Sequence, residues 1–156
     1  MKKIFLAVLV ICIASTVNAQ NLSSTYKTAI GAKVYFQDGT DGGINIKHFL
    51  NNKAALEGTL LFSRYSIGIE GLYEWHDDIA GAPGLKWYAG AGGLIGFYTK
   101  KHFDDDVYFA LRGAFGLDYK IKGAPINLAF DLNPSFILSP DTDFNFGAGL
   151  AMRFAL

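Results

Sequence analysis

Residues 116–136, GLDYKIKGAPINLAFDLNPSF, decide the fold because apolar and polar residues alternate along them. Leu117 and Tyr119 fall on one side of the chain, and Asp118 falls between them on the other. The alternation breaks at residues 122–125, which include Gly and Pro, and then resumes. A period of two indicates β-strands with one apolar and one polar face, and the break indicates a hairpin turn.

The same alternation recurs eight times, between clusters of Gly, Pro, Asn and Asp that are typical of turns. Most of these segments have the roughly nine to eleven residues that a tilted strand needs to cross a bilayer. An even number of antiparallel strands suits a closed barrel. The sequence therefore predicts an all-β fold, an eight-stranded antiparallel up-and-down transmembrane barrel. The expected strands cover residues 26–36, 43–50, 54–63, 65–76, 85–98, 107–121, 125–137 and 144–154.

Residues 1–19 are predicted to be a secretory signal peptide. Two lysines are followed by an apolar run over residues 4–14 and then by small residues before Gln20, where cleavage is expected. The run is too short for a retained membrane helix, and Cys12 lies inside it, which disfavours lipoprotein processing. Residues 20–156 are then expected to form one outer-membrane barrel domain.

The composition of the mature chain excludes several classes of function. Removing the signal peptide takes away two lysines and the single cysteine, so 12 basic residues face 14 acidic ones, a net charge of −2. This balance does not suggest a nucleic-acid partner, and no disulfide or thiol chemistry remains. The later chain has no apolar run of about 18 residues, so any membrane span must be made of strands.

Charged side chains recur on the polar face of the expected strands, beside glycines such as Gly92 and Gly149. Glycine only weakens a solvated strand, but in a narrow barrel it leaves room for a long neighbouring side chain. Charges of both signs can then satisfy one another inside the lumen, either as a structural plug or as a gate whose pairs exchange partners. The predicted lumen charge network consists of Lys33, Glu57, Glu70, Glu74, Arg112, Asp118, Lys120, Asp131 and Arg153.

The apolar face carries aromatic residues toward both ends of the strands and aliphatic residues between them. Lipid interfaces select two such bands, whereas a soluble lipocalin-like binding barrel, the alternative, has no reason to place aromatics at both rims. The apolar face is therefore predicted to contact lipid. The expected interface residues are Tyr26, Tyr73, Trp75, Trp87, Tyr119 and Phe154 at the inner rim, and Phe36, Phe62, Phe97, Phe109, Phe144 and Phe146 at the outer rim.

The signal peptide, the eight-strand rhythm and residues 116–119, 125–128 and 131–136 together resemble small outer-membrane β-barrel proteins of the OmpX and OmpW kind. The last strand is similar to the assembly signal of such barrels, although the chain ends Phe154-Ala155-Leu156 rather than on an aromatic residue. The resemblance implies a Gram-negative outer membrane, with lipids and lipopolysaccharide around the barrel. It also implies periplasmic chaperones and the barrel-assembly machinery as partners during biogenesis. The short outer loops disfavour an adhesive role.

Local features add few candidates. Pro134 inside a strand predicts a bulge near the outer rim. His102 with residues 104–106, and His76 with Asp77 and Asp78, could bind a divalent cation, but short acidic loops are more often simply solvated. His48 is expected on the apolar face near the inner interface, where an amphipathic ring is at home.

An enzyme, such as a lipid-modifying barrel, would need a nucleophile, a base and an orienting group together near one rim. Ser63, Ser66 and Ser135 are expected at the outer rim, with no histidine on a strand beside them. The sequence contains no GxSxG, HExxH or glycine-rich phosphate loop. The predicted function is therefore non-enzymatic, without metal or cofactor: envelope structure and integrity, or alternatively narrow gated permeation. The sequence does not predict an oligomeric state.

Overall fold

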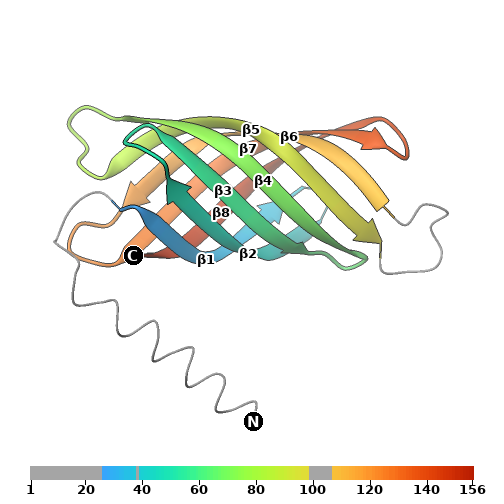
Figure 1. The fold of residues 1–156 in the computed structure, drawn as a ribbon, viewed down its shortest axis with the longest axis horizontal. Helices are drawn as coiled ribbons and strands as arrows, with labels where there is room; N and C mark the ends of the chain where they lie inside the picture. Colours follow the sequence, from blue (N-terminus) through green and yellow to red (C-terminus); the bar gives the residue numbers. More distant parts are fainter. Residues whose placement is uncertain (1–25, 38, 99–106) are drawn as a thin grey trace, which may run out of the picture.

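The eight expected strands are confirmed and close into an antiparallel barrel in chain order (Figure 1). The computed structural model describes residues 26–37, 39–98 and 107–156. Each strand end lies within three residues of the expected one. The strands are β1 (Thr28–Phe36), β2 (Thr40–Phe49), β3 (Ala54–Phe62), β4 (Ser66–Asp78), β5 (Leu85–Tyr98), β6 (Val107–Lys120), β7 (Ile126–Ser139) and β8 (Asp143–Ala155).

The barrel has its polarity inverted relative to a soluble protein, as β4 illustrates. Successive residues from Ser66 to His76 are alternately buried and exposed. The side chains that point outward are apolar, with Ile69 59% and Trp75 60% exposed, whereas Glu70 and Glu74 point into the lumen and are buried. Charged residues are normally found on a protein surface rather than inside it. The alternation therefore places charge in the lumen and apolar side chains on the wall.

The strands are tilted, which their pairing register reveals. From Lys33 on β1, register partners followed through β2 and β3 reach Gly68 on β4. Followed the other way round, through β8, β7, β6 and β5, they reach Asp78 on the same strand, ten residues away. A ten-residue shift in an eight-stranded barrel corresponds to a strand tilt of about 40°, so one residue advances about 2.5 Å along the axis.

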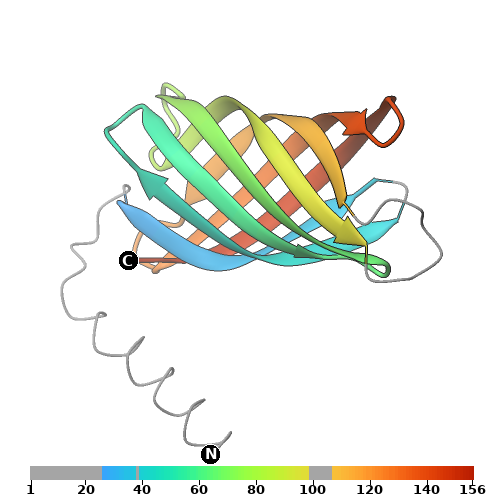
Figure 2. The same cartoon turned by 45° about the vertical axis from the view of Figure 1, so that its right-hand side comes forward.

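Both termini of the barrel lie at one end, which we call the inner end (Figure 2). The turns after β2, β4 and β6 lie there too, and β1, β3, β5 and β7 end at the opposite, outer end. At the outer end of the lumen, Tyr35, Leu61, Leu94 and Ala110 form an apolar cluster. A second small apolar cluster consists of Leu72, Tyr88 and Ala114.

The predicted bulge lies near the outer end, but not at Pro134. The register between β6 and β7 shifts where Phe109 pairs with Ser139 and Ala110 with Ile137. Pro134 keeps its place opposite Phe146 of β8 and interrupts only the ladder toward β6, because proline has no N–H to donate. In the described ranges, no helix is long and apolar enough to cross a membrane.

The lumen charge network as the candidate functional site

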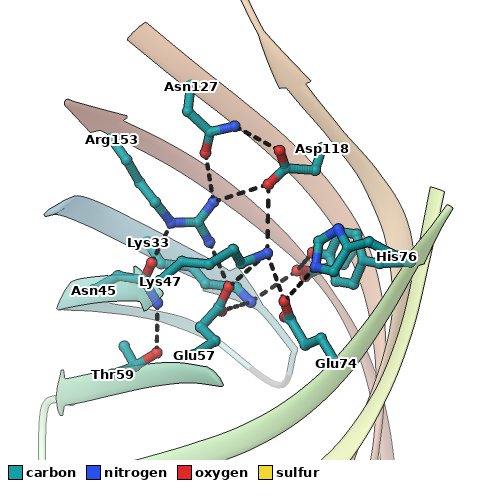
Figure 3. A network of polar contacts seen from close by, with 12 residues as sticks. Lys33, Asn45, Lys47, Glu57, Thr59, Glu74, His76, Asp118, Asn127 and Arg153 are labelled. Carbon is teal, nitrogen blue, oxygen red and sulfur yellow. Dashed lines mark hydrogen bonds and ion pairs between the residues drawn. The ribbon is translucent and has the colours of Figure 1, made fainter. Parts of the chain in front are cut away.

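Glu57 of β3 lies at the centre of an ionic cluster in the inner half of the lumen (Figure 3). Its Oε1 is 2.7 Å from Lys33 Nζ, and its Oε2 is 3.0 Å from Lys47 Nζ and 2.6 Å from Arg153 Nη2. The three cations come from β1, β2 and β8. One carboxylate therefore joins strands on both sides of the barrel seam.

Each of the three cations also reaches a further carboxylate. Lys33 Nζ lies 2.7 Å from Asp131 Oδ2, and Arg153 Nη1 lies 3.6 Å from Asp118 Oδ2. Lys47 Nζ lies 2.8 Å from Glu74 Oε2 and 3.4 Å from Asp118 Oδ2. All of these side chains are at most 2% exposed, so water does not screen the pairs.

Neutral polar side chains fix the geometry of the inner cluster. Arg153 donates from Nε to Asn45 Oδ1 and from Nη1 to Asn127 Oδ1, the latter at 2.9 Å. Asn127 Nδ2 donates in turn to Asp118 Oδ1 at 2.7 Å, and Asn45 Nδ2 donates to Thr59 Oγ1 at 2.8 Å. The guanidinium is thus held by amides as well as by carboxylates, which a buried charge requires.

A second, smaller group lies nearer the outer end. Arg112 Nε donates to Glu70 Oε2 at 2.7 Å, and its Nη1 donates to Gln37 Oε1 at 3.2 Å. The Tyr35 hydroxyl donates to the other oxygen of Glu70. The Tyr35 ring centroid lies 4.9 Å from both Lys33 Nζ and Arg112 Cζ. Tyr35 therefore links the outer pair to the inner cluster through cation–π contacts.

Four aromatic rings pack together at the inner end of the lumen. Tyr26 packs edge-on against Phe49 with 5.1 Å between centroids, Phe49 lies 4.7 Å from His76, and His76 stacks on Tyr88 at 4.9 Å. His76 Nε2 lies 2.9 Å from Glu74 Oε2, and the Tyr88 hydroxyl donates to Asp131. We call these four rings, from Tyr26 to Tyr88, the inner aromatic row.

Tyr26, which precedes β1, joins this row through its hydroxyl as well as its ring. The hydroxyl lies 3.0 Å from Asp118 Oδ2. Burial and the negative charge of Asp118 raise the pKa of the Tyr26 phenol well above its usual range. Tyr26 thus stays a neutral donor to the lumen.

The structure brings eight of the nine predicted lumen charges into these two groups and places Lys120 apart. Lys120 donates to the backbone carbonyls of Ile121 at 3.2 Å and Ala124 at 2.7 Å. It therefore stabilises the turn after β6, because a strand end leaves carbonyls without ladder partners.

Two further expectations were wrong. Tyr26 was predicted at the lipid interface, but its ring lies in the inner aromatic row, because the chain at this point has not yet entered β1. His76, the last residue of the expected strand, was predicted to be solvated at the rim, but β4 continues to Asp78 and the His76 ring is completely buried. Asp77 and Asp78 remain exposed at the rim, where they pair with Lys53 and Lys86.

The other eleven predicted interface aromatics point outward. Ten of them are at least 38% exposed, and Phe154 is half-buried. His48 also lies on the outward face, with its Nδ1 2.8 Å from Thr28 Oγ1. Ser66 and Ser135 are buried at the outer end, whereas His48 and His76 lie at the inner end.

Sequence reasoning missed five lumen residues that the alternation itself could have indicated. Lys47 and Asn45 fall on the same face of β2, and Asn127 falls on the polar face of β7. Tyr35 and Tyr88 also occupy alternate positions that face the lumen. An aromatic residue in a predicted barrel is, however, readily assigned to the lipid-facing side. The candidate at His102 and residues 104–106 lies outside the described residues.

The structure is similar to a solved β-barrel domain of another protein. The crystal structure of the N-terminal β-barrel domain of Pseudomonas aeruginosa OprF is similar, with a TM-score of 0.64 and 17% sequence identity. The match covers 83% of this chain and 100% of that one. The chain shares its barrel fold. No family model and no curated protein matches the chain.

Within residues 26–37, 39–98 and 107–156, no three His, Cys, Asp or Glu side chains are grouped so as to hold a metal ion. The lumen carboxylates Glu57, Glu70, Glu74, Asp118 and Asp131 are instead each paired with a lysine or an arginine. The arrangement can bind its own strands together and, if partners exchange, move charge along the lumen.

Proposed function

We propose that this protein is a non-enzymatic, integral outer-membrane barrel that contributes to envelope structure and integrity as a closed wall element. The barrel is expected to be surrounded by outer-membrane lipids and lipopolysaccharide. Periplasmic chaperones and the barrel-assembly machinery are its proposed partners during biogenesis. The fold shared with the OprF barrel domain supports the barrel architecture in this proposal, and the rest of the proposal depends on the outward face and the lumen.

The outward face supports a membrane location. On β5 to β8 the outward apolar positions extend over ten residues, for example from Trp87 to Phe97 on β5. At about 2.5 Å per residue this is about 25 Å, the height of the apolar band on outer-membrane barrels. A water-soluble protein rarely exposes a continuous apolar surface of this size.

The buried lumen network is the observation that carries the proposal of a closed barrel. The side chains of Lys33, Lys47, Glu57 and Arg153 are 0% exposed, so they occupy the lumen rather than line a water-filled channel. The inner aromatic row closes one end, and the apolar cluster around Leu61 and Leu94 closes the other. A lumen of eight strands is just wide enough for side chains to fill it.

A gated channel is the second candidate, and the shared partners favour it. Glu57 contacts three cations and Lys47 contacts three carboxylates, so either can lose one partner without becoming unpaired. Such redundancy permits exchange of partners at low cost, because no charge is left bare in the lumen. The Arg112–Glu70 pair would then be the outer gate.

Fractionation tests the proposed location. We expect the mature chain to sediment with outer membranes and to be released only by detergent. Release of folded protein from the periplasm without detergent would overturn the proposal in favour of a soluble binding barrel.

A strain that lacks the gene tests the proposed role. It should take up more of a dye that intact outer membranes exclude, and the wild-type gene should restore exclusion. Unchanged dye uptake would contradict a role in envelope integrity while leaving the location unaffected.

A further inference from the structure

The apolar wall of the barrel is much shorter on β1–β3 than on β5–β8. The outward apolar positions extend from Ile30 to Phe36 on β1 and from Leu56 to Phe62 on β3, six residues each. On β6 and β8 they extend over ten residues, from Phe109 to Tyr119 and from Phe144 to Phe154. At about 2.5 Å per residue, the wall is about 15 Å high on one side and about 25 Å on the other.

On β1, most of the difference lies at the outer end. At the inner end, Ile30 of β1 pairs with Phe154 of β8 and lies only about one residue farther outward, because the ten-residue shift moves register partners outward by about one residue from β8 to β1. At the outer end, Phe36 pairs with Ala148, and β8 continues outward for four more residues to Phe144, which therefore lies about three residues outward of Phe36. Tilting the barrel in a membrane cannot remove this difference, because it is a difference in height between two sides of one rigid wall.

The outer part of the short side is polar. On β2 the outermost apolar side chain is Ile44, because the next outward positions are Gly42 and the exposed Thr40. The turn after β3 carries Arg64, which is exposed and lies 5.2 Å from the Tyr65 ring. A cation just outward of Phe62, the last apolar residue of β3, fits the phosphate of a lipid headgroup rather than its acyl chain.

We propose that the β1–β3 wall is an interaction surface for the headgroups of outer-leaflet lipids, which it draws inward so that the bilayer is locally thinned beside it. This inference rests on the proposed outer-membrane location and specifies how the barrel meets its lipids. A hydrophobic stretch shorter than the bilayer is accommodated by thinning the bilayer next to it. The β5–β8 side, about 25 Å high, requires no such adjustment.

Two outward positions of equal height allow a matched test. Gly42, Phe62, Ile67 and Phe97 are register partners across β2 to β5. Because the register shifts by ten residues around eight strands, partners are not level: across the three steps from β2 to β5 they move outward by about four residues. Phe97 therefore lies about four residues farther out than Gly42. Gly93, four residues inward of Phe97, is therefore level with Gly42. Thr40 and Ile95, each two residues farther out on these strands, are level as well.

The experiment places one nitroxide spin label at each level position. The mature chain contains no cysteine, so Thr40→Cys and Ile95→Cys each give a single labelling site. The labelled barrels are refolded into vesicles of phosphatidylcholine with phosphatidylglycerol. Collision with a water-soluble nickel chelate then reports water and headgroups, and collision with oxygen reports hydrocarbon. We expect several-fold more nickel collision at residue 40 than at residue 95.

The outcomes separate this inference from the proposed function. Equal, low nickel collision at both sites would overturn the thinned side while leaving membrane insertion intact. Equal, high collision at both sites would contradict the membrane location itself.

If either variant fails to fold, Phe36→Cys and Leu111→Cys form a second pair. The register partners of Phe36, followed through β8 and β7 to β6, are Ala148, Leu132 and Phe115. Phe115 lies about four residues inward of Phe36, so Leu111, four residues outward of Phe115, is level with Phe36. Nickel collision should again be greater on β1, and equal values would overturn the inference.

Discussion

Glu57 is the residue on which most of the inner lumen depends. It accepts contacts from Lys33, Lys47 and Arg153, and all four side chains are fully buried. Removing one partner of a buried ion pair lowers the stability of the fold far more than removing one partner of a surface pair, because the remaining charge stays buried without its partner. The three cations retain other carboxylates, which limits but does not remove that cost.

Glu57→Gln should therefore lower the free energy of unfolding by about 3 kcal/mol. Urea titration in lipid vesicles measures this, with the fluorescence of the two outward tryptophans as the signal. Asp78→Asn is the matched control, because it removes a charge from a pair whose acidic side chain is 75% exposed. If Glu57→Gln were no more destabilising than Asp78→Asn, the network would not hold the barrel together.

Tyr26→Phe tests whether the residue before β1 belongs to the lumen. The change removes only the hydroxyl that contacts Asp118, and loss of a hydrogen bond to a charged group should cost about 1.5 kcal/mol. Tyr119→Phe, on the outward face, should leave stability unchanged in the same titration. Equal effects of the two variants would return Tyr26 to the lipid interface.

At the scale of the strand, glycine has opposite roles on the two faces. A Cβ on Gly149 would lie 2.9 Å from Asn133 Oδ1 and 3.0 Å from Lys33 Cε, and closer still to Asp131 Oδ1. A Cβ on Gly71, which faces outward, would have no heavy atom within 4 Å. The lumen glycine therefore provides space for the network, and the outward one does not.

Gly149→Ala should destabilise the barrel by about 1–3 kcal/mol through overpacking. Gly71→Ala should leave stability unchanged or raise it by about 0.4–1 kcal/mol, because alanine restricts the unfolded chain. Thermal or urea unfolding of both variants measures the contrast. If Gly149→Ala left stability unchanged, the lumen would have space for the added methyl group.

The outward face of β8 gives a second prediction at this scale. Leu150 lies near mid-wall and Phe144 lies at the outer rim. Leu150→Arg should cost about 2–4 kcal/mol in a bilayer, whereas Phe144→Arg should cost about 0–1 kcal/mol. Refolding yield and urea midpoints in vesicles compare the two. Equal costs would argue against a lipid-facing wall.

The strands were predictable because period-two alternation is a local property of the sequence. Where strands end, local pattern fails: Tyr26 precedes β1, β4 extends past His76 to Asp78, and Lys120 lies at the last position of β6. The surroundings of these three residues depend on which strands and turns meet at the inner end of the barrel. The sequence of a single strand does not contain that information. Partner choice in the network, such as Lys47 with three carboxylates, depends on register across the barrel and could not be read from the sequence.

At the scale of the whole molecule, the barrel is a wall closed around its own charges. The inner aromatic row, the ionic cluster around Glu57, the Arg112–Glu70 pair and the outer apolar cluster follow one another along the lumen. In the proposed closed barrel, each would have to move before an ion could pass. The uneven height of the apolar wall gives the same molecule two different lipid-facing sides.

Single-channel conductance of the refolded mature chain in a planar bilayer tests the closed barrel most directly. We expect the wild-type barrel to insert and remain silent, and Arg112→Ala combined with Glu70→Ala to remain silent too, because the inner cluster and aromatic row still close the lumen. Discrete, reproducible conductance steps from the wild-type chain, altered by neutralising Arg112 or Glu70, would contradict the closed wall and favour the gated channel.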